Sequence, residues 1–195
     1  MSSYIDQNLF LFLQACWVLY CFADIKFKQE NILVEAVRLT TNSLLNDRDL
    51  PVKVNAAIAL QNLLQYQDKA QTFVEPWIKQ ITMELLNIIR LTENEDLTTV
   101  IQKIVCTYPE QLMPIAVEMC QHLATTFRQV LETDEGSDEK AITAMGLLNT
   151  IDTLLSVMEN HPLIISQLQP IVLQVIAHIF NQSVMGKLKN SCNSQ

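Results

Sequence analysis

Acidic side chains crowd into one short polar stretch of the chain, residues 132–139, which reads ETDEGSDE. Carboxylates at this density can attract the lysine and arginine side chains of a basic protein partner. They can equally form a solvated loop, and the later acids would suit the positive N-terminus of a following helix. Both interpretations stay open. The candidate contact residues are Glu132, Asp134, Glu135, Asp138 and Glu139.

A second group of acids, Glu93, Glu95 and Asp96, stands where a helix over about 95–107 is expected to begin. Capping and the helix dipole explain acids at such a position. The alternative is a contact with a partner, because the second helix of each repeat in a helical array usually lines its inner surface. These three residues are therefore weaker candidates for a contact site.

Residues arranged for catalysis or metal binding are not found. The sequence has no G-x-S-x-G, Walker or dinucleotide-binding motif, and its three glycines cannot form a phosphate-binding loop. Cys120 and His122 lie two positions apart, so a helix would direct them to different faces. No set of His, Cys, Asp and Glu has zinc spacing, and 132–139 lacks the spacing of an EF-hand. We expect no enzyme activity, no metal and no cofactor.

The composition favours a folded, helical protein with a protein partner. Hydrophobic residues make up 49% of the 195 residues, charged residues make up 17%, and strand-rich folds usually need more glycine. The net charge is −8, and lysine and arginine are not clustered, so direct nucleic-acid binding is not expected. A basic protein is the better partner for this charge.

The cysteines and the most apolar segment bear on the cell compartment. The five cysteines are odd in number, scattered and without a CxxC, which predicts buried free thiols in a reducing compartment. The apolar run within 9–25 contains Gln14 and is shorter than the roughly 20 residues of a membrane span. We interpret it as a buried helix, expect no membrane insertion, and expect Trp17 and Trp77 in the core.

Apolar residues at helical spacing, with proline and polar breaks, predict eight helices. Their ranges are about 6–24, 29–46, 51–66, 70–91, 95–107, 109–132, 138–159 and 162–183. The helices that begin at 29, 70 and 109 start about 40 residues apart, which is typical of HEAT repeats, and the insert 132–139 explains the longer last interval. We predict an all-α, right-handed solenoid of HEAT or armadillo type with about four helix pairs. Residues 1–28 would end a preceding repeat, 29–185 would form the array, and 186–195 would be a disordered tail.

Small residues in the third helix fit this repeat. Alanines 56, 57 and 59 bury little area but let neighbouring backbones approach closely. In the turn before this helix, Asp47 is expected to cap nearby N–H groups. Lys53 is expected to pair with acids in adjacent turns.

Several longer stretches carry a more specific resemblance. The segments ACWVLYCFADIKF (15–27), PVKVNAAIALQNLL (51–64), 93–127 and 135–161 resemble the importin-β superfamily of nuclear transport receptors, specifically its importin seven/eight branch. The resemblance covers roughly residues 14–176. Because members of the family are several times longer, it implies an internal section of such a receptor. The family's N-terminal Ran-binding domain has no counterpart in this sequence.

The resemblance implies a cargo carrier. The cargo would be a basic protein of histone or ribosomal-protein type, held by acidic inner surfaces, and the acids of 132–139 would contact cargo or Ran. Ran GTPase and nucleoporins would bind the full-length receptor, which would shuttle between cytoplasm and nucleus. The alternative is a HEAT-repeat scaffold without a transport role, and only the family resemblance favours the carrier over it.

Overall fold

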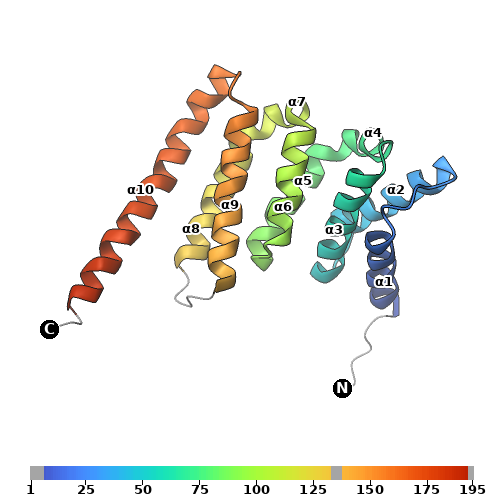
Figure 1. Cartoon of the computed structure of the whole chain (residues 1–195), viewed down its shortest axis with the longest axis horizontal. Coiled ribbons are helices and arrows are strands. Elements are labelled where there is room, and N and C mark those ends of the chain that lie inside the picture. Colours follow the sequence, from blue (N-terminus) through green and yellow to red (C-terminus); the bar gives the residue numbers. More distant parts are fainter. Residues whose placement is uncertain (1–6, 133–137, 193–195) are drawn as a thin grey trace. The chain divides into compact units, whose positions relative to one another are not determined.

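The computed structural model describes residues 7–132 and 138–192, and within them every regular element is a helix (Figure 1). The chain divides into two compact units, Met1–Leu112 and Met113–Gln195. Each unit is built from helices that pack in pairs. This confirms the predicted all-α fold of HEAT-type repeats, while the right-handed turn of the array stays a prediction.

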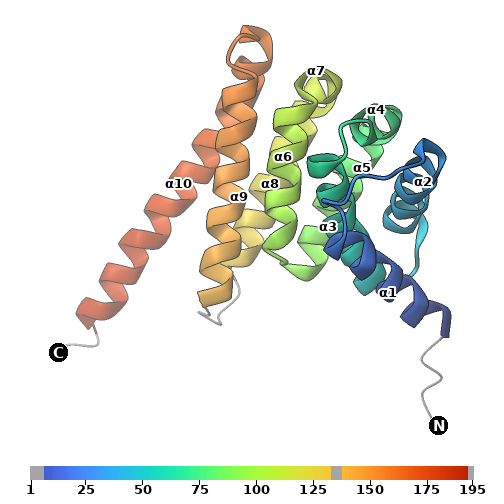
Figure 2. The same ribbon diagram turned by 45° about the vertical axis from the view of Figure 1, so that its right-hand side comes forward.

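The first unit has two layers of helices. Its elements are α1 (Gln7–Cys21), α2 (Glu30–Asn46), α3 (Leu50–Tyr66), α4 (Ala70–Val74), the 3-10 turn η1 (Glu75–Trp77), α5 (Ile78–Thr92), α6 (Asp96–Thr107) and α7 (Pro109–Leu112). Helix α3 contacts α1 on one side and α6 on the other, whereas α2 contacts α4 and α5 (Figure 2). Helices α1, α3 and α6 therefore form one layer, and α2, α4 and α5 form the other.

The second unit contains one packed helix pair and a long helix. Its elements are the 3-10 turn η2 (Met113–Ile115), α8 (Ala116–Glu132), α9 (Asp138–Val157) and α10 (Pro162–Cys192). Helix α8 contacts both α9 and α10. The side chains at its centre, such as Met119, Leu123 and Phe127, are buried.

Proline positions set several helix boundaries. Pro51 stands in the first turn of α3, where its missing N–H leaves no helical hydrogen bond unmade. Pro76 lies in the 3-10 turn between α4 and α5, so the helix predicted over 70–91 is interrupted there. Pro170 lies inside α10 without ending it. The helix extends beyond the predicted end at residue 183 as far as Cys192, so the part of the expected disordered tail before residue 193 is helical.

The alanines of α3 occupy the centre of the first unit. Ala56, Ala57 and Ala59 are fully buried, and α3 contacts α1, α2, α5 and α6. A larger side chain at these positions would push a neighbouring helix away. The expectation that small residues admit close neighbours is confirmed.

The turn before α3 contains the predicted polar contacts with one correction. The carboxylate of Asp47 accepts a hydrogen bond of 2.9 Å from the N–H of Asp49. Lys53 pairs with Glu84 and also donates to the carbonyl oxygen of Leu45. Glu84 lies within helix α5, so the expected acid in an adjacent turn is wrong, because Lys53 reaches across the helix layers.

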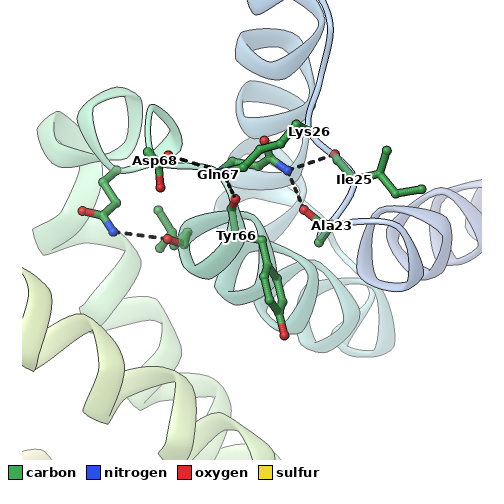
Figure 3. Close-up of polar contacts among 8 residues, drawn as sticks. Ala23, Ile25, Lys26, Tyr66, Gln67 and Asp68 are labelled. Atoms are coloured by element: carbon green, nitrogen blue, oxygen red, sulfur yellow. Dashed lines mark hydrogen bonds and ion pairs between the residues drawn. The ribbon is translucent and has the colours of Figure 1, made fainter.

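Polar contacts tie the segment after α1 to the end of α3 (Figure 3). The buried Gln67 side chain donates from Nε2 to the carbonyl oxygens of Ala23, at 2.5 Å, and Ile25, at 3.0 Å. Lys26 donates to the carbonyl oxygen of Tyr66 and pairs with the exposed carboxylate of Asp68. Gln67 thereby satisfies two carbonyl groups that would otherwise need solvent.

Several apolar or sulfur-containing side chains lie elsewhere than predicted. Cys16 and Cys120 are buried free thiols, but Cys21 and Cys106 are exposed, so the prediction of burial is wrong for the latter two. Trp17 and Trp77 are 59% and 49% exposed, so their expected place in the core is also wrong. Helical spacing shows which apolar residues share a face of a helix, but it does not show which face a neighbouring helix covers.

Helix α10 contains a long apolar segment with exposed side chains. Its segment Pro162–Asn181 is long and apolar enough to cross a membrane by length and composition, and 11% of it is buried. Leu163, Leu173 and Phe180 are among its exposed side chains. One such helix does not by itself establish a membrane protein, and α10 packs against α8. The absence of membrane insertion stays a prediction.

Candidate functional site

The acids of residues 132–139 lie around the connection between α8 and α9. Glu132 is the exposed last residue of α8, and Asp138 is the exposed first residue of α9. Glu139 is in the first turn of α9. Asp134 and Glu135 lie outside the described residues. Asp138 and Glu139 lie at the N-terminus of α9, where the helix dipole favours negative charge. This position fits both interpretations of the acids, the solvated loop before a helix and the contact with a basic partner.

The second acidic group lies in the turn between α5 and α6. Glu93 ends α5 in a left-handed conformation, with φ of 52°, and its N–H donates to the carbonyl oxygen of Ile89. The side chain of Asn94 accepts a hydrogen bond from the N–H of Asp96 at 3.0 Å. Asn94 therefore performs the capping expected of the acids, and the carboxylates of Glu95 and Asp96 are exposed.

Asp96 opens onto a groove formed by α1, α3 and α6. The groove has a volume of about 410 Å³ and is lined by Trp17, Tyr20, Asn55, Ile58, Gln61, Asn62, Asp96 and Thr99. Each of the three helices in this layer supplies part of the lining. The indole of Trp17 and the phenol of Tyr20 are about half exposed and form the α1 side of the groove.

The amides of the groove are oriented by their own helix. The side-chain nitrogen of Asn55 donates to the carbonyl oxygen of Pro51, and that of Asn62 donates to the carbonyl oxygen of Ile58, both at 2.9 Å. These bonds restrict the rotation of each amide. Asn55 and Asn62 lie two helical turns apart on α3, so they present hydrogen-bonding groups along the length of the groove.

The groove is suited to binding a positive charge rather than to catalysis. Asp96 is the one charged residue of its lining. An aromatic face attracts lysine and arginine side chains, and a carboxylate close by adds direct charge attraction. In the residues that the structure describes, no group of three or more His, Cys, Asp or Glu side chains could hold a metal ion.

Sequence reasoning found part of this groove. Asp96 was a candidate, whereas Trp17 and Tyr20 were not assigned to a site. The available signal was their spacing of three residues, which places both on one face of α1. The decisive information was that α1 packs against α3, which places Trp17 and Tyr20 in a groove with α3 residues, and that contact joins segments about 40 residues apart.

Known proteins resemble this chain along most of its length. Importin-8 of Danio rerio is 44% identical over 185 residues, which cover 93% of this chain and 18% of that protein. Importin-8 of Homo sapiens is 45% identical over 174 residues, which cover 88% of this chain and 17% of that protein. The chain is homologous to one section of importin-8.

A more distant relative is also named as an importin. The probable importin-7 homolog of Dictyostelium discoideum is 26% identical over 178 residues, which cover 90% of this chain and 16% of that protein. No family model and no solved structure matches the chain. The chain thus spans less than a fifth of the length of these importins. Their names are those of importins and not of enzymes, which agrees with the expectation of a chain without enzyme activity.

Proposed function

We propose that this chain is a section of a nuclear import receptor that holds basic protein cargo, with the groove between α1, α3 and α6 as one contact site. The observation that carries the proposal is that Asp96 lines the same groove as Trp17 and Tyr20 in an importin homologue. A lysine or arginine of the cargo would lie against the aromatic rings and pair with Asp96. The net charge of −8 would draw such a cargo towards the chain.

The cargo class that fits is a lysine- and arginine-rich protein of histone or ribosomal-protein type. Its extended segments could hydrogen-bond to Asn55 and Asn62 while a basic side chain reaches Asp96. The exposed acids Glu132 and Asp138 would supply a second contact for the same kind of cargo. In the full-length receptor, Ran GTPase would release the cargo. Nucleoporins would bind the receptor in the nuclear pore, and the receptor would shuttle between cytoplasm and nucleus.

The test measures binding of a labelled lysine- and arginine-rich histone-tail peptide to the 195-residue chain by fluorescence anisotropy over a range of salt concentrations. Asp96→Asn should weaken binding about three- to fivefold at low salt and flatten the salt dependence, because an exposed ion pair contributes up to about 1 kcal/mol. Trp17→Leu should weaken binding to a similar extent by removing the aromatic face. The matched control is Glu110→Gln, which neutralises an exposed acid outside the groove.

A parallel variant separates the two acidic sites. Neutralising Glu132, Asp134, Glu135, Asp138 and Glu139 together should also weaken the peptide and flatten its salt dependence. If this variant loses binding while Asp96→Asn does not, the cargo is held at the α8–α9 connection and the groove is not a cargo site. Unchanged affinity in both would reject the proposal for this chain.

The alternative function is that of a HEAT-repeat scaffold without a transport role. It predicts stable incorporation into a protein complex and indifference to basic peptides. Adding Ran-GTP to the full-length receptor distinguishes the two, because a carrier should release its cargo and a scaffold should not.

A further inference from the structure

Helix α1 is apolar on two sides, and one of these sides is exposed. The helix packs against α3, and its residue Cys16 is buried. Five large apolar side chains of this segment are instead between 45% and 62% exposed: Phe10, Leu11, Trp17, Val18 and Phe22. At 100° per residue they project about 100–160° away from Cys16 around the helix axis. We call these five residues the outer stripe of α1.

The outer stripe is continuous and large enough for a protein interface. Phe22 follows the end of α1, but its N–H still donates to the carbonyl oxygen of Val18 at 3.0 Å, so it keeps its place in the stripe. From Phe10 to Phe22 the stripe is about 18 Å long, at 1.5 Å per residue. Because large apolar side chains bury about 150–250 Å² each, five that are half exposed offer roughly 500 Å². Two such faces together reach the roughly 1,000 Å² that a specific interface needs.

The charge of this segment indicates which surface can cover it. Residues 7–23 contain no charged side chain, although the whole chain carries a net charge of −8. A charged partner would have to bury its charges against apolar groups without compensation. An anionic lipid surface would be repelled by the chain, and α1 lacks the lysines and arginines of helices that lie on membranes. An uncharged apolar face of the same size fits best, and a second copy of α1 supplies one.

We propose that two copies of this chain pair through the outer stripes of their α1 helices, and that pairing closes the cargo groove. The same patch on both copies forms a two-fold interface, which is the commonest symmetry of protein dimers. Trp17 belongs to the outer stripe and also lines the groove that contains Asp96. A second copy that covers the Trp17 indole therefore excludes a basic side chain from it. The exclusion rests on the proposed function, whereas the pairing does not.

Sedimentation equilibrium of the 195-residue chain, from low micromolar to several hundred micromolar, tests the pairing. The parent chain should pass from monomer to dimer, and added salt should strengthen the dimer by screening the repulsion between two acidic copies. Leu11→Lys, in the stripe but outside the groove lining, should abolish the dimer, and Leu11→Ala should weaken it about tenfold. The matched control is Leu91→Lys, at a similarly exposed leucine of α5, which should leave the dimer unchanged. Each variant is checked for helical circular dichroism.

Adding the histone-tail peptide at saturating concentration tests the exclusion and should return the dimer to monomers. A chain that stays monomeric throughout, or a dimer that survives Leu11→Lys, would overturn the pairing through α1. A dimer that weakens as salt rises would also overturn it, because charges would then hold the copies together. A dimer that persists with the peptide bound would overturn the exclusion. A dimer in a chain that binds no peptide would leave the pairing standing and reject the cargo groove instead.

Discussion

Tyr108 shows how a single polar side chain is accommodated in the first unit. The side chain is buried at the end of α6, and its hydroxyl donates to the carbonyl oxygen of Gln71 at 3.0 Å. Burial raises the pKa of Tyr108 to about 12, and the negative charge of Glu75 contributes in the same direction. Both causes disfavour the phenolate, so the neutral form is the one that the fold stabilises.

The titration of Tyr108 gives the residue-scale prediction. Because its pKa is raised on folding, its contribution to stability is complete below pH 10 and is lost as the pH rises from about 10 to about 12. The phenolate absorbance should show one late step near pH 12, close to alkaline unfolding. Tyr108→Phe should remove that step and lower the free energy of unfolding by about 1 kcal/mol. Tyr66→Phe, at an exposed tyrosine, should keep the step, and a late step in Tyr108→Phe would contradict the assignment.

Individual residues also show where sequence reasoning stops. Asp96 could be proposed as a contact residue because an exposed acid at a helix start is visible in the sequence. Trp17 could not, since its helix is apolar on most sides and only the contact of α1 with α3 decides which side is covered.

At the scale of elements, local patterns fixed most boundaries. The predicted ranges 51–66 and 95–107 match α3 and α6 to within about a residue, because prolines and polar turns punctuate them. The range 109–132 was predicted as one helix, but it is divided into α7, the 3-10 turn η2 with Pro114, and α8. The end of α10 was misplaced, since the polar residues after Gly186 do not prevent helix formation. Pairwise packing was predictable from the repeat period, whereas the partner of Lys53 was not, because Glu84 lies 31 residues away.

The packing of α3 supports a prediction about its alanines. Ala57→Leu inserts a larger side chain into a position that is fully buried between neighbouring helices. The variant should lower the free energy of unfolding by about 1–3 kcal/mol, as overpacked cores do. Chemical denaturation followed by circular dichroism measures the loss. Ala141→Leu makes the same change at an exposed position of α9 and should stay within about 0.5 kcal/mol of the parent chain; equal losses in both would show that Ala57 is not a close-packing position.

At the scale of the whole molecule, the chain is a short array of repeats. In such arrays each repeat contacts its neighbours, and stability is approximately a sum of local terms. The division into two compact units at Leu112 and Met113 suits this description. Both tryptophans lie in the first unit, so tryptophan fluorescence reports on that unit, whereas circular dichroism reports on helices throughout the chain.

This difference in probes leads to a prediction about local unfolding. Leu154 of α9 and Leu60 of α3 are both fully or almost fully buried, one in each unit. Replacing either leucine by alanine should cost about 2–5 kcal/mol. In denaturant, Leu154→Ala should shift part of the circular dichroism transition to lower concentration and leave the fluorescence midpoint unchanged, because the weakened helices carry no tryptophan. Leu60→Ala should shift the fluorescence midpoint itself. If both variants moved both signals together, the two units would unfold as one cooperative body, and local stability would not be the right description of this chain.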